Sequence, residues 1–250
     1  MEIRIEELLD AFRKDAPTDE LMIAKLKAID ECLKPKNLKE ACLLIIDMQK
    51  GFLEEGAALE VPDGRTKCAP NIEKLLIRAR EIGLNIVFTK YVHRPGSSRL
   101  SAYPFAPEVF EHRAGSARGP FHPSSCCMVG DPTAEIVDEL KPLQNEIVIE
   151  KQGYDAFHET HLDSGLRSRG INYMYICGVM TDICVDSTIR SGFHREYRIT
   201  VASDAVATIW PNIQEACLDI WKRKFCRIRM VDEILNEWGF LKNRNISNQA

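Results

Sequence analysis

The sequence predicts an α/β fold: a three-layer α/β/α sandwich around a mainly parallel, Rossmann-like sheet of six strands. From residue 41 onward, short apolar runs alternate with longer amphipathic segments. This alternation is typical of strands joined by right-handed helical crossovers. Runs such as Leu43 to Ile46 are apolar at every position, as expected for parallel strands that are buried on both faces.

The short apolar runs are the strand candidates, and they occupy residues 43–48, 84–89, 146–149, 173–177, 198–202 and 226–231. The helix candidates between them have apolar residues at helical spacing, and they cover residues 68–82, 132–140, 159–169, 182–194 and 211–224. Residues 93–132 form a long segment rich in Pro, Gly and Ser. Such segments are more often functional lids or subunit contacts than idle loops.

The residues before this alternation predict a separate unit. Apolar residues such as Leu8, Phe12 and Leu26 recur at helical spacing there, so residues 1–40 are expected to form an N-terminal helical extension. The α/β domain is then expected to span residues 41–240, and residues 241–250 to form a C-terminal tail.

Composition and charge restrict the classes of partner. The 250 residues carry a formal net charge of -4 with scattered Lys and Arg, which argues against nucleic acid or a membrane surface as the partner. No apolar stretch approaches the roughly 20 residues that span a bilayer, and the charged N-terminus is unlike a secretory signal. The nine cysteines include no Cys-x-x-Cys pair, so neither a disulfide framework nor a zinc ribbon is predicted. A cytoplasmic protein is expected.

Polar residues near the ends of three predicted strands form a candidate catalytic site. Ligands of open α/β sheets bind at the carboxyl ends of the strands. Asp47 ends the first run, Lys151 follows the third, and Cys184 opens the helix after the fourth. A helix N-terminus favours thiolate over thiol, so Cys184 is expected to be unusually reactive.

Each of these residues has a plain structural interpretation when it is taken singly. Asp47 alone is a turn or cap residue, Lys151 a solvated lysine and Cys184 a small buried hydrophobe. The hypothesis of a catalytic site therefore depends on the conjunction of a carboxylate, an ammonium and a thiol.

Three sequence motifs occur in order between residues 41 and 238. They are Asp47-Met48-Gln49 followed by Phe52, the segment from Lys151 to Phe157, and Gly178-Val179-Met180-Thr181-Asp182-Ile183-Cys184-Val185. With these motifs the chain resembles the isochorismatase-like superfamily of cysteine hydrolases. The resemblance implies that residues 41–240 form a hydrolase domain of that type.

The resemblance also implies a division of labour among the site residues. Asp47 takes the thiol proton, Cys184 attacks a carbonyl carbon, and Lys151 holds the carboxylate and the thiolate in an ion-paired cluster, which agrees with general principles of thiol catalysis. The backbone N–H groups of Met180 and Cys184 are expected to form the oxyanion hole. A cis peptide bond is expected between Val179 and Met180.

Some members of this superfamily, the nicotinamidases, bind a metal through an Asp-x-His after the second strand. Here Tyr91 stands in place of the acid, two residues before His93. We therefore predict no metal and no other cofactor. His93 is expected to be a hydrogen-bonding pocket or structural residue, with His112 and His122 as the remaining possible ligands.

The cysteine also bears on the reaction. True isochorismatases cleave a vinyl ether and generally lack it, so Cys184 favours hydrolysis of an amide, ureido or carbamoyl bond of a small metabolite, with a thioester intermediate and release of ammonia or an amine. Residues 166–171 and 187–190 are similar to the ureidoacrylate and carbamoyl amidohydrolases, although this similarity speaks to kinship more than to substrate. Three alternatives stay open: a vinyl ether hydrolase, a non-catalytic metabolite-binding protein, and a redox protein that uses Cys184 with Cys177.

The substrate-binding candidates lie close after the first three predicted strands and are expected to line a concave pocket: Gln49, Phe52, Tyr91, His93, Arg94, Tyr154 and Phe157. Arg94 or Arg99 is a candidate clamp for a substrate carboxylate, and the alternative is a solvated or intersubunit arginine. The resemblance further implies a homo-oligomer, a dimer or tetramer, to which the N-terminal helices are able to contribute.

Overall fold

A computed structural model describes residues 24, 27–28, 30–57, 59–94 and 127–247. At its centre is a six-stranded parallel sheet in the order β3-β2-β1-β4-β5-β6. The strands are β1 (Ala41–Ile46), β2 (Asn85–Tyr91), β3 (Ile147–Lys151), β4 (Tyr173–Val179), β5 (Arg198–Ala207) and β6 (Arg227–Arg229). Each overlaps a predicted strand, so the predicted parallel sheet is confirmed.

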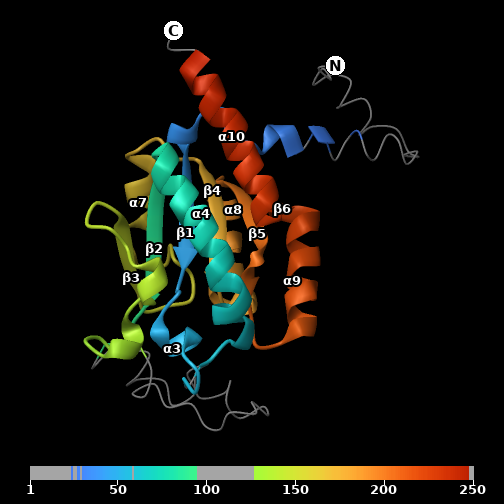
Figure 1. The fold of residues 1–250 in the computed structure, drawn as a ribbon. Helices are drawn as coiled ribbons and strands as arrows, with labels where there is room; N and C mark the ends of the chain where they lie inside the picture. The colour runs from blue at the N-terminus through green and yellow to red at the C-terminus, as the bar shows by residue number, and fades with distance from the viewer. Residues whose placement is uncertain (1–23, 25–26, 29, 58, 95–126, 248–250) are drawn as a thin grey trace.

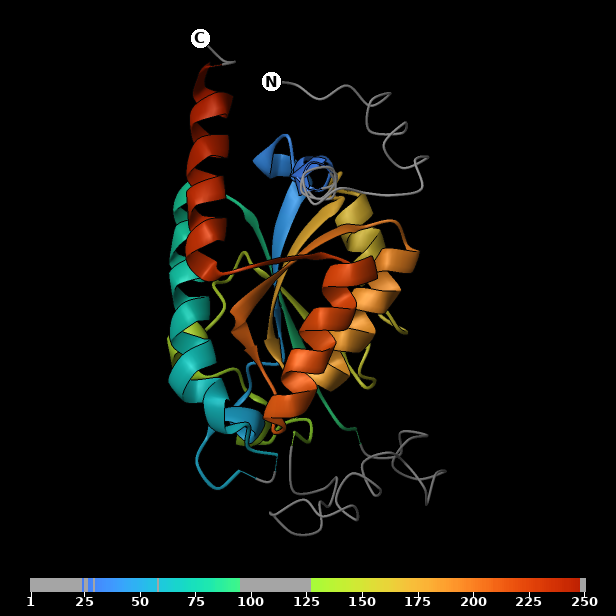
Figure 2. The same ribbon diagram turned by 90° about the vertical axis from the view of Figure 1, so that its right-hand side faces the viewer.

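Helices cover both faces of this sheet (Figures 1 and 2). One face carries α4 (Ala69–Ile82) and α10 (Val231–Ser247), and the other carries α7 (Leu162–Arg167), α8 (Asp186–His194) and α9 (Pro211–Lys224). Successive residues of β1 serve the two faces in turn, since Leu43 belongs to one hydrophobic core and Leu44 to the other. The three-layer α/β/α sandwich predicted from the sequence is therefore confirmed.

Helix α4 illustrates how the local sequence sets an element. Pro70 stands in its first turn, where the missing N–H costs nothing. Gly83 ends the helix with a left-handed φ of 69° and donates its N–H to Ala79 and Arg80 carbonyls. The buried stripe includes Ile72 and Leu75, and each such side chain contributes about 1.5–3 kcal/mol when it is removed from water.

The helix predicted over residues 132–140 is wrong. The segment contains two single 3₁₀ turns instead, η4 (Pro132–Ala134) and η5 (Asp138–Leu140). Between these turns the backbone bonds to the loop after β1: Lys50 donates its N–H to the Glu135 carbonyl at 2.8 Å, and Val137 donates to the Met48 carbonyl at 3.0 Å. Pairing with a distant segment has replaced the hydrogen bonds of a local helix.

The C-terminal helix α10 is not among the predicted helices. Its buried residues Val231, Ile234, Trp238 and Leu241 recur at helical spacing and pack in the same core as α4. The predicted domain end at residue 240 falls inside α10.

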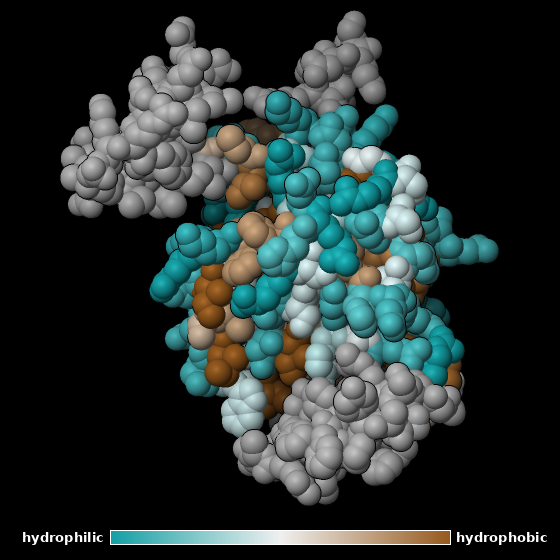
Figure 3. Space-filling model, turned by 180° about the vertical axis from the view of Figure 1, so that it is seen from behind, coloured by the Kyte–Doolittle hydropathy of each residue, from teal (hydrophilic) through white to brown (hydrophobic). Residues whose placement is uncertain are grey.

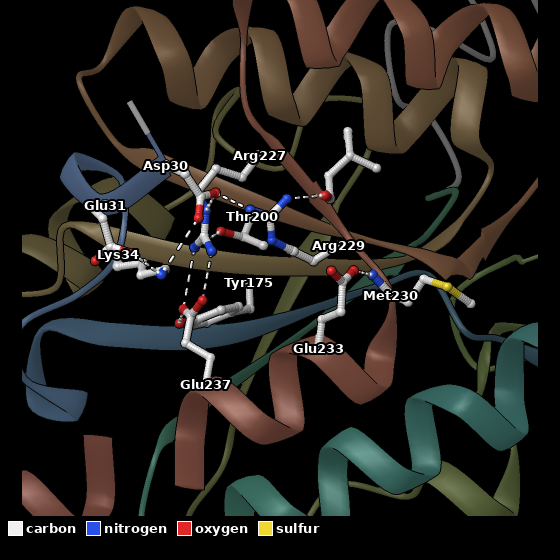
Figure 4. A network of polar contacts seen from close by, with 11 residues as sticks. Asp30, Glu31, Lys34, Tyr175, Thr200, Arg227, Arg229, Met230, Glu233 and Glu237 are labelled. Carbon is white, nitrogen blue, oxygen red and sulfur yellow. Dashed lines mark hydrogen bonds and ion pairs between the residues drawn. The ribbon is translucent and has the colours of Figure 1, made fainter. Parts of the chain in front are cut away.

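A network of ion pairs joins Asp30, which precedes β1, to the sheet and α10 (Figure 4). The buried guanidinium of Arg227 donates to Asp30 at 2.7 Å, to Glu237 at 2.6 Å and to the Thr200 hydroxyl at 3.0 Å. Tyr175 donates its hydroxyl to the same Glu237 carboxylate. Because a buried charge is costly unless it is paired, these contacts attach the helical residues around Asp30 to the domain. Residues 1–23, 25–26 and 29 of the predicted N-terminal extension lie outside the described residues.

Strand β4 ends in a close approach to β1 that requires glycine. Gly178 has a φ of 120°, and a Cβ atom placed there would lie 2.1 Å from the carbonyl oxygen of Ile46. Ile46 is the last residue of β1 and directly precedes Asp47. A side chain at position 178 would therefore displace the end of β1 or of β4.

We expect Gly178→Ala to lower the free energy of unfolding by about 2–4 kcal/mol, because it adds both overpacking and backbone strain. Urea denaturation measures this change. Gly239→Ala in α10 is the matched control, since nothing lies within 4 Å of its Cβ position. That variant should be stabilised by about 0.5–1 kcal/mol. Equal stability of Gly178→Ala and the wild type would contradict the close approach.

The face of the molecule opposite to that of Figure 1 is mainly hydrophilic, with apolar groups scattered over it (Figure 3). Exposed apolar side chains on α8 and α9 include Phe193, Ile213 and Ile220. Within the described parts of the chain, no helix has both the length and the apolar character needed to cross a membrane.

Candidate active site

Asp47, Lys151 and Cys184 lie together at the carboxyl edge of the sheet. Asp47 directly follows β1, Lys151 is the last residue of β3, and Cys184 lies in the π-helical turn η6 (Thr181–Val185) between β4 and α8. Their exposed fractions are 0%, 1% and 5%. The topology thus brings together the three side chains that the sequence singles out, in a site shielded from solvent.

The carboxylate of Asp47 is held through both of its oxygens. The hydroxyl of Thr89 donates to Oδ1 at 2.6 Å, and Nζ of Lys151 forms an ion pair with Oδ2 at 2.6 Å. Asp47 also has a left-handed φ of 51°, a conformation that Asp adopts more readily than bulky residues do. The backbone therefore turns sharply where the carboxylate is presented.

Lys151 extends past β2, which lies between β1 and β3. Its Nζ donates to the carbonyl of Gly153 at 3.1 Å and lies 5.1 Å from the centre of the Tyr91 ring, as in a cation–π contact. Burial alone lowers the pKa of this ammonium, but Asp47 and Cys184 raise it, and the net result is a pKa above the ordinary value. Lys151 therefore stays charged.

The thiol of Cys184 differs from the expectation. Burial raises its pKa well above the ordinary value; the opposing effect of Lys151 is smaller, and Asp47 adds to the increase. This effect of burial opposes the predicted preference for a thiolate at the helix N-terminus. A thiol whose pKa is raised in this way needs a base at the moment of attack.

The turn between β4 and Cys184 contains the residues predicted for the oxyanion hole. The peptide bond between Val179 and Met180 is cis. The carbonyl of Met180 accepts the N–H of Val185 at 3.1 Å. Thr181 at the start of η6 donates its hydroxyl to Gln214 of α9. These contacts fix the backbone that carries the N–H groups of Met180 and Cys184.

The structure argues against Gln49 as a substrate contact. Its side chain is fully buried. The amide group donates to the carbonyls of Tyr91 and Ala134, both at 2.9 Å, and accepts the N–H of Tyr91 at 2.7 Å. Gln49 therefore joins the loop after β1 to the end of β2, which positions the neighbouring Asp47.

Four of the predicted substrate-binding residues form an aromatic cluster around Tyr91. The centre of its ring lies 6.3 Å from that of Phe52, 4.8 Å from that of His93 and 5.9 Å from that of Tyr154. Because Tyr91 also contacts the ammonium of Lys151, this cluster forms the apolar surroundings of the ion pair.

Phe157 and Arg94 lie elsewhere. Phe157 stacks on Tyr197 at 5.5 Å in the core beneath α7 and α8, which argues against the prediction that it lines the substrate pocket. Tyr154, which is close to Phe157 in the sequence, contacts both hydrophobic cores. The chain therefore turns between Tyr154 and Phe157. Arg94 forms an exposed ion pair with Glu150. Arg99, His112 and His122 lie outside the described residues.

Two further predictions concern thiols and metals. Cys177 and Cys184 are both free cysteines, and Cys177 is buried inside β4, so no disulfide joins them as the redox alternative requires. In the described part of the chain, no three His, Cys, Asp or Glu side chains lie together in a group suited to hold a metal ion.

The contact that sequence reasoning missed is Thr89. It is the last residue of the predicted strand 84–89 and lies inside β2, two residues before that strand ends. A hydroxyl residue directly after the apolar run Ile86-Val87-Phe88 was the available signal, because a buried polar group needs a partner.

Comparisons with known proteins agree with this arrangement. The model of the isochorismatase domain matches residues 41–233. The ureidoacrylate amidohydrolase RutB of Cronobacter turicensis is 32% identical over 205 residues, which cover 77% of this chain and 88% of that protein.

Solved structures resemble the described fold. A cysteine hydrolase from Pseudomonas syringae pv. phaseolicola superposes with a TM-score of 0.70 and 26% identity, covering 80% of this chain and 93% of that one. The N-carbamoylsarcosine amidase from Thermoplasma acidophilum gives a TM-score of 0.59 and 28% identity, covering 77% and 97%. Since the family model spans most of the sequence, the chain belongs to the isochorismatase domain family.

Proposed function

We propose that this protein is a cysteine-dependent hydrolase that cleaves a carbon–nitrogen bond in a small amide, ureido or carbamoyl compound. The observation that carries the proposal is the buried convergence of Cys184 with the Asp47–Lys151 ion pair. The similarity to a ureidoacrylate amidohydrolase and to an N-carbamoylsarcosine amidase supports the same bond type.

The first chemical step forms the tetrahedral intermediate that precedes the thioester. As the sulfur of Cys184 attacks the carbonyl carbon, its proton passes to the carboxylate of Asp47, which acts as the general base. The ammonium of Lys151 stabilises the negative charge that develops on the sulfur. The backbone N–H groups of Met180 and Cys184 donate to the oxyanion of the tetrahedral intermediate.

The second step breaks the carbon–nitrogen bond. Asp47, now protonated, returns its proton to the departing nitrogen, so ammonia or an amine leaves and a thioester remains on Cys184. Water then attacks the thioester while Asp47 accepts a proton from it; Asp47 returns that proton to the sulfur of Cys184 as the carbon–sulfur bond breaks, and the acid product is released. The aromatic cluster around Tyr91 excludes water from the ion pair during the first step.

The proposal also covers cofactors, oligomeric state and cellular compartment. Since Tyr91 occupies the position of the acid in the metal-binding motif, the proposed reaction uses no metal and no other cofactor. We also propose a homo-oligomer, a dimer or tetramer, as the resemblance to the superfamily implies. Light scattering of the purified protein tests that assembly. The cytoplasm is the proposed compartment.

A panel of amides, ureido acids and carbamoyl amines, assayed for ammonia or amine release, tests the function. We expect release that requires Cys184 and that is unaffected by a chelator. Asp47→Asn is expected to be nearly as inactive as Cys184→Ala, because the groups act as a unit. Release that a chelator abolishes would contradict the metal-free reaction. Absence of release from every compound would favour the ether-cleaving or the non-catalytic alternative.

A further inference from the structure

Besides the charged Lys151, the carboxylate of Asp47 has an uncharged hydrogen-bond partner, Thr89. Thr89 of β2 is fully buried, and its hydroxyl donates to Oδ1 of Asp47 at 2.6 Å. The same hydroxyl accepts the backbone N–H of Asp47 at 3.2 Å. A hydroxyl has only one proton to donate, so the two contacts together direct that proton to Oδ1.

The other carboxylate oxygen of Asp47, Oδ2, faces the ammonium of Lys151. Oδ2 lies 2.6 Å from Nζ of Lys151, while Oδ1 is occupied by Thr89. Rotation about the last bond of an Asp side chain meets only broad, shallow preferences. Partners on both oxygens are therefore needed to keep the carboxylate plane in one orientation.

We propose that Thr89 is a positioning residue of the hydrolase: it caps Oδ1 of Asp47 and leaves Oδ2 as the oxygen that exchanges the proton with Cys184. This inference rests on the function proposed above. In this proposal one carboxylate oxygen is held in place and the other takes part in the reaction. The residue that holds the first oxygen lies in β2, between β1, which Asp47 follows, and β3, which carries Lys151.

Thr89→Val removes the hydroxyl and keeps the shape of the side chain. We expect kcat to fall by about 10- to 100-fold with little change in KM, because a misplaced general base affects the chemical step more than binding. Thr89→Ser restores the donor and should recover most of kcat.

Thr200→Val is the matched control. Thr200 is also a buried strand threonine, but its hydroxyl accepts from Arg227, away from the site. It should lose stability and keep the wild-type kcat. If Thr89→Val does not fold, the pair Thr89→Ser and Thr89→Ala isolates the hydroxyl, and the serine variant is expected to be the faster enzyme.

A Thr89→Val enzyme with wild-type kcat would overturn the inference, as would an equal loss of kcat in Thr200→Val. Equal activity of the serine and alanine variants would overturn it in the same way. Wild type and Cys184→Ala are assayed beside these variants. An inactive wild type counts against the proposed function, whereas an active wild type that is indifferent to Thr89 counts against the positioning role alone.

Discussion

Cys184→Ala is expected to reduce hydrolysis by roughly 10,000-fold or more, because no other group supplies the nucleophile and the members of a catalytic unit fail together. The fold should persist, since a small apolar side chain replaces another small one in a buried turn. Steady-state kinetics and thermal unfolding of the purified variant measure the two effects separately.

Cys226→Ala is the control for this experiment. Cys226 is also a buried free cysteine, but it lies in the core beneath α9, beside β6. Cys226→Ala should lower the free energy of unfolding by about as much as Cys184→Ala does, and it should leave the rate of hydrolysis unchanged. Turnover by Cys184→Ala close to that of the wild type would refute the nucleophile assignment.

Lys151→Met is expected to be the most damaging change to stability at the site. It leaves the buried carboxylate of Asp47 without its counter-charge, and breaking a buried pair in this way costs about 3–5 kcal/mol. Activity should be lost as well, because the developing charge on the sulfur has no partner. Chemical denaturation combined with the hydrolysis assay measures both losses.

The double variant Asp47→Asn with Lys151→Met separates the charge effect from packing. It removes both charges, so it should regain much of the stability that Lys151→Met loses while remaining inactive. Lys90→Met serves as the control, because Lys90 pairs with an exposed carboxylate of Glu135, and such a pair contributes about 0–1 kcal/mol. Additive effects of the two active-site changes would contradict the ion pair.

The strands and the three central side chains were predictable because their signals are local. A parallel strand buried on both faces is apolar throughout, and its polar successor stands at the binding edge, as Asp47 and Lys151 do. Residues 132–140 were mispredicted because their hydrogen bonds go to Met48 and Lys50, which local periodicity does not reveal. The sequence of α10 has apolar residues at helical spacing, but its first residue, Val231, was assigned to the preceding predicted strand.

Other properties of the site depend on burial, and sequence does not give burial at this level of detail. The helix N-terminus favours a thiolate at Cys184, yet removal from water outweighs it. Gln49 has the chemistry of a ligand-binding residue, but its amide is used by backbone groups. Phe157 shares a motif with Tyr154 and still packs beneath α8, because the chain turns between them.

The central claim is that a thioester forms on Cys184, and acid-quenched mass spectrometry tests it most directly. The wild type is mixed with an aryl ester analogue of the best substrate from the panel, chosen so that acylation outpaces hydrolysis, then quenched and digested. We predict an added mass equal to the acyl group on the peptide that contains Cys184, and none in Cys184→Ala. An acyl group on another residue, or hydrolysis of the analogue with no acylated Cys184 at any time point, would contradict the account.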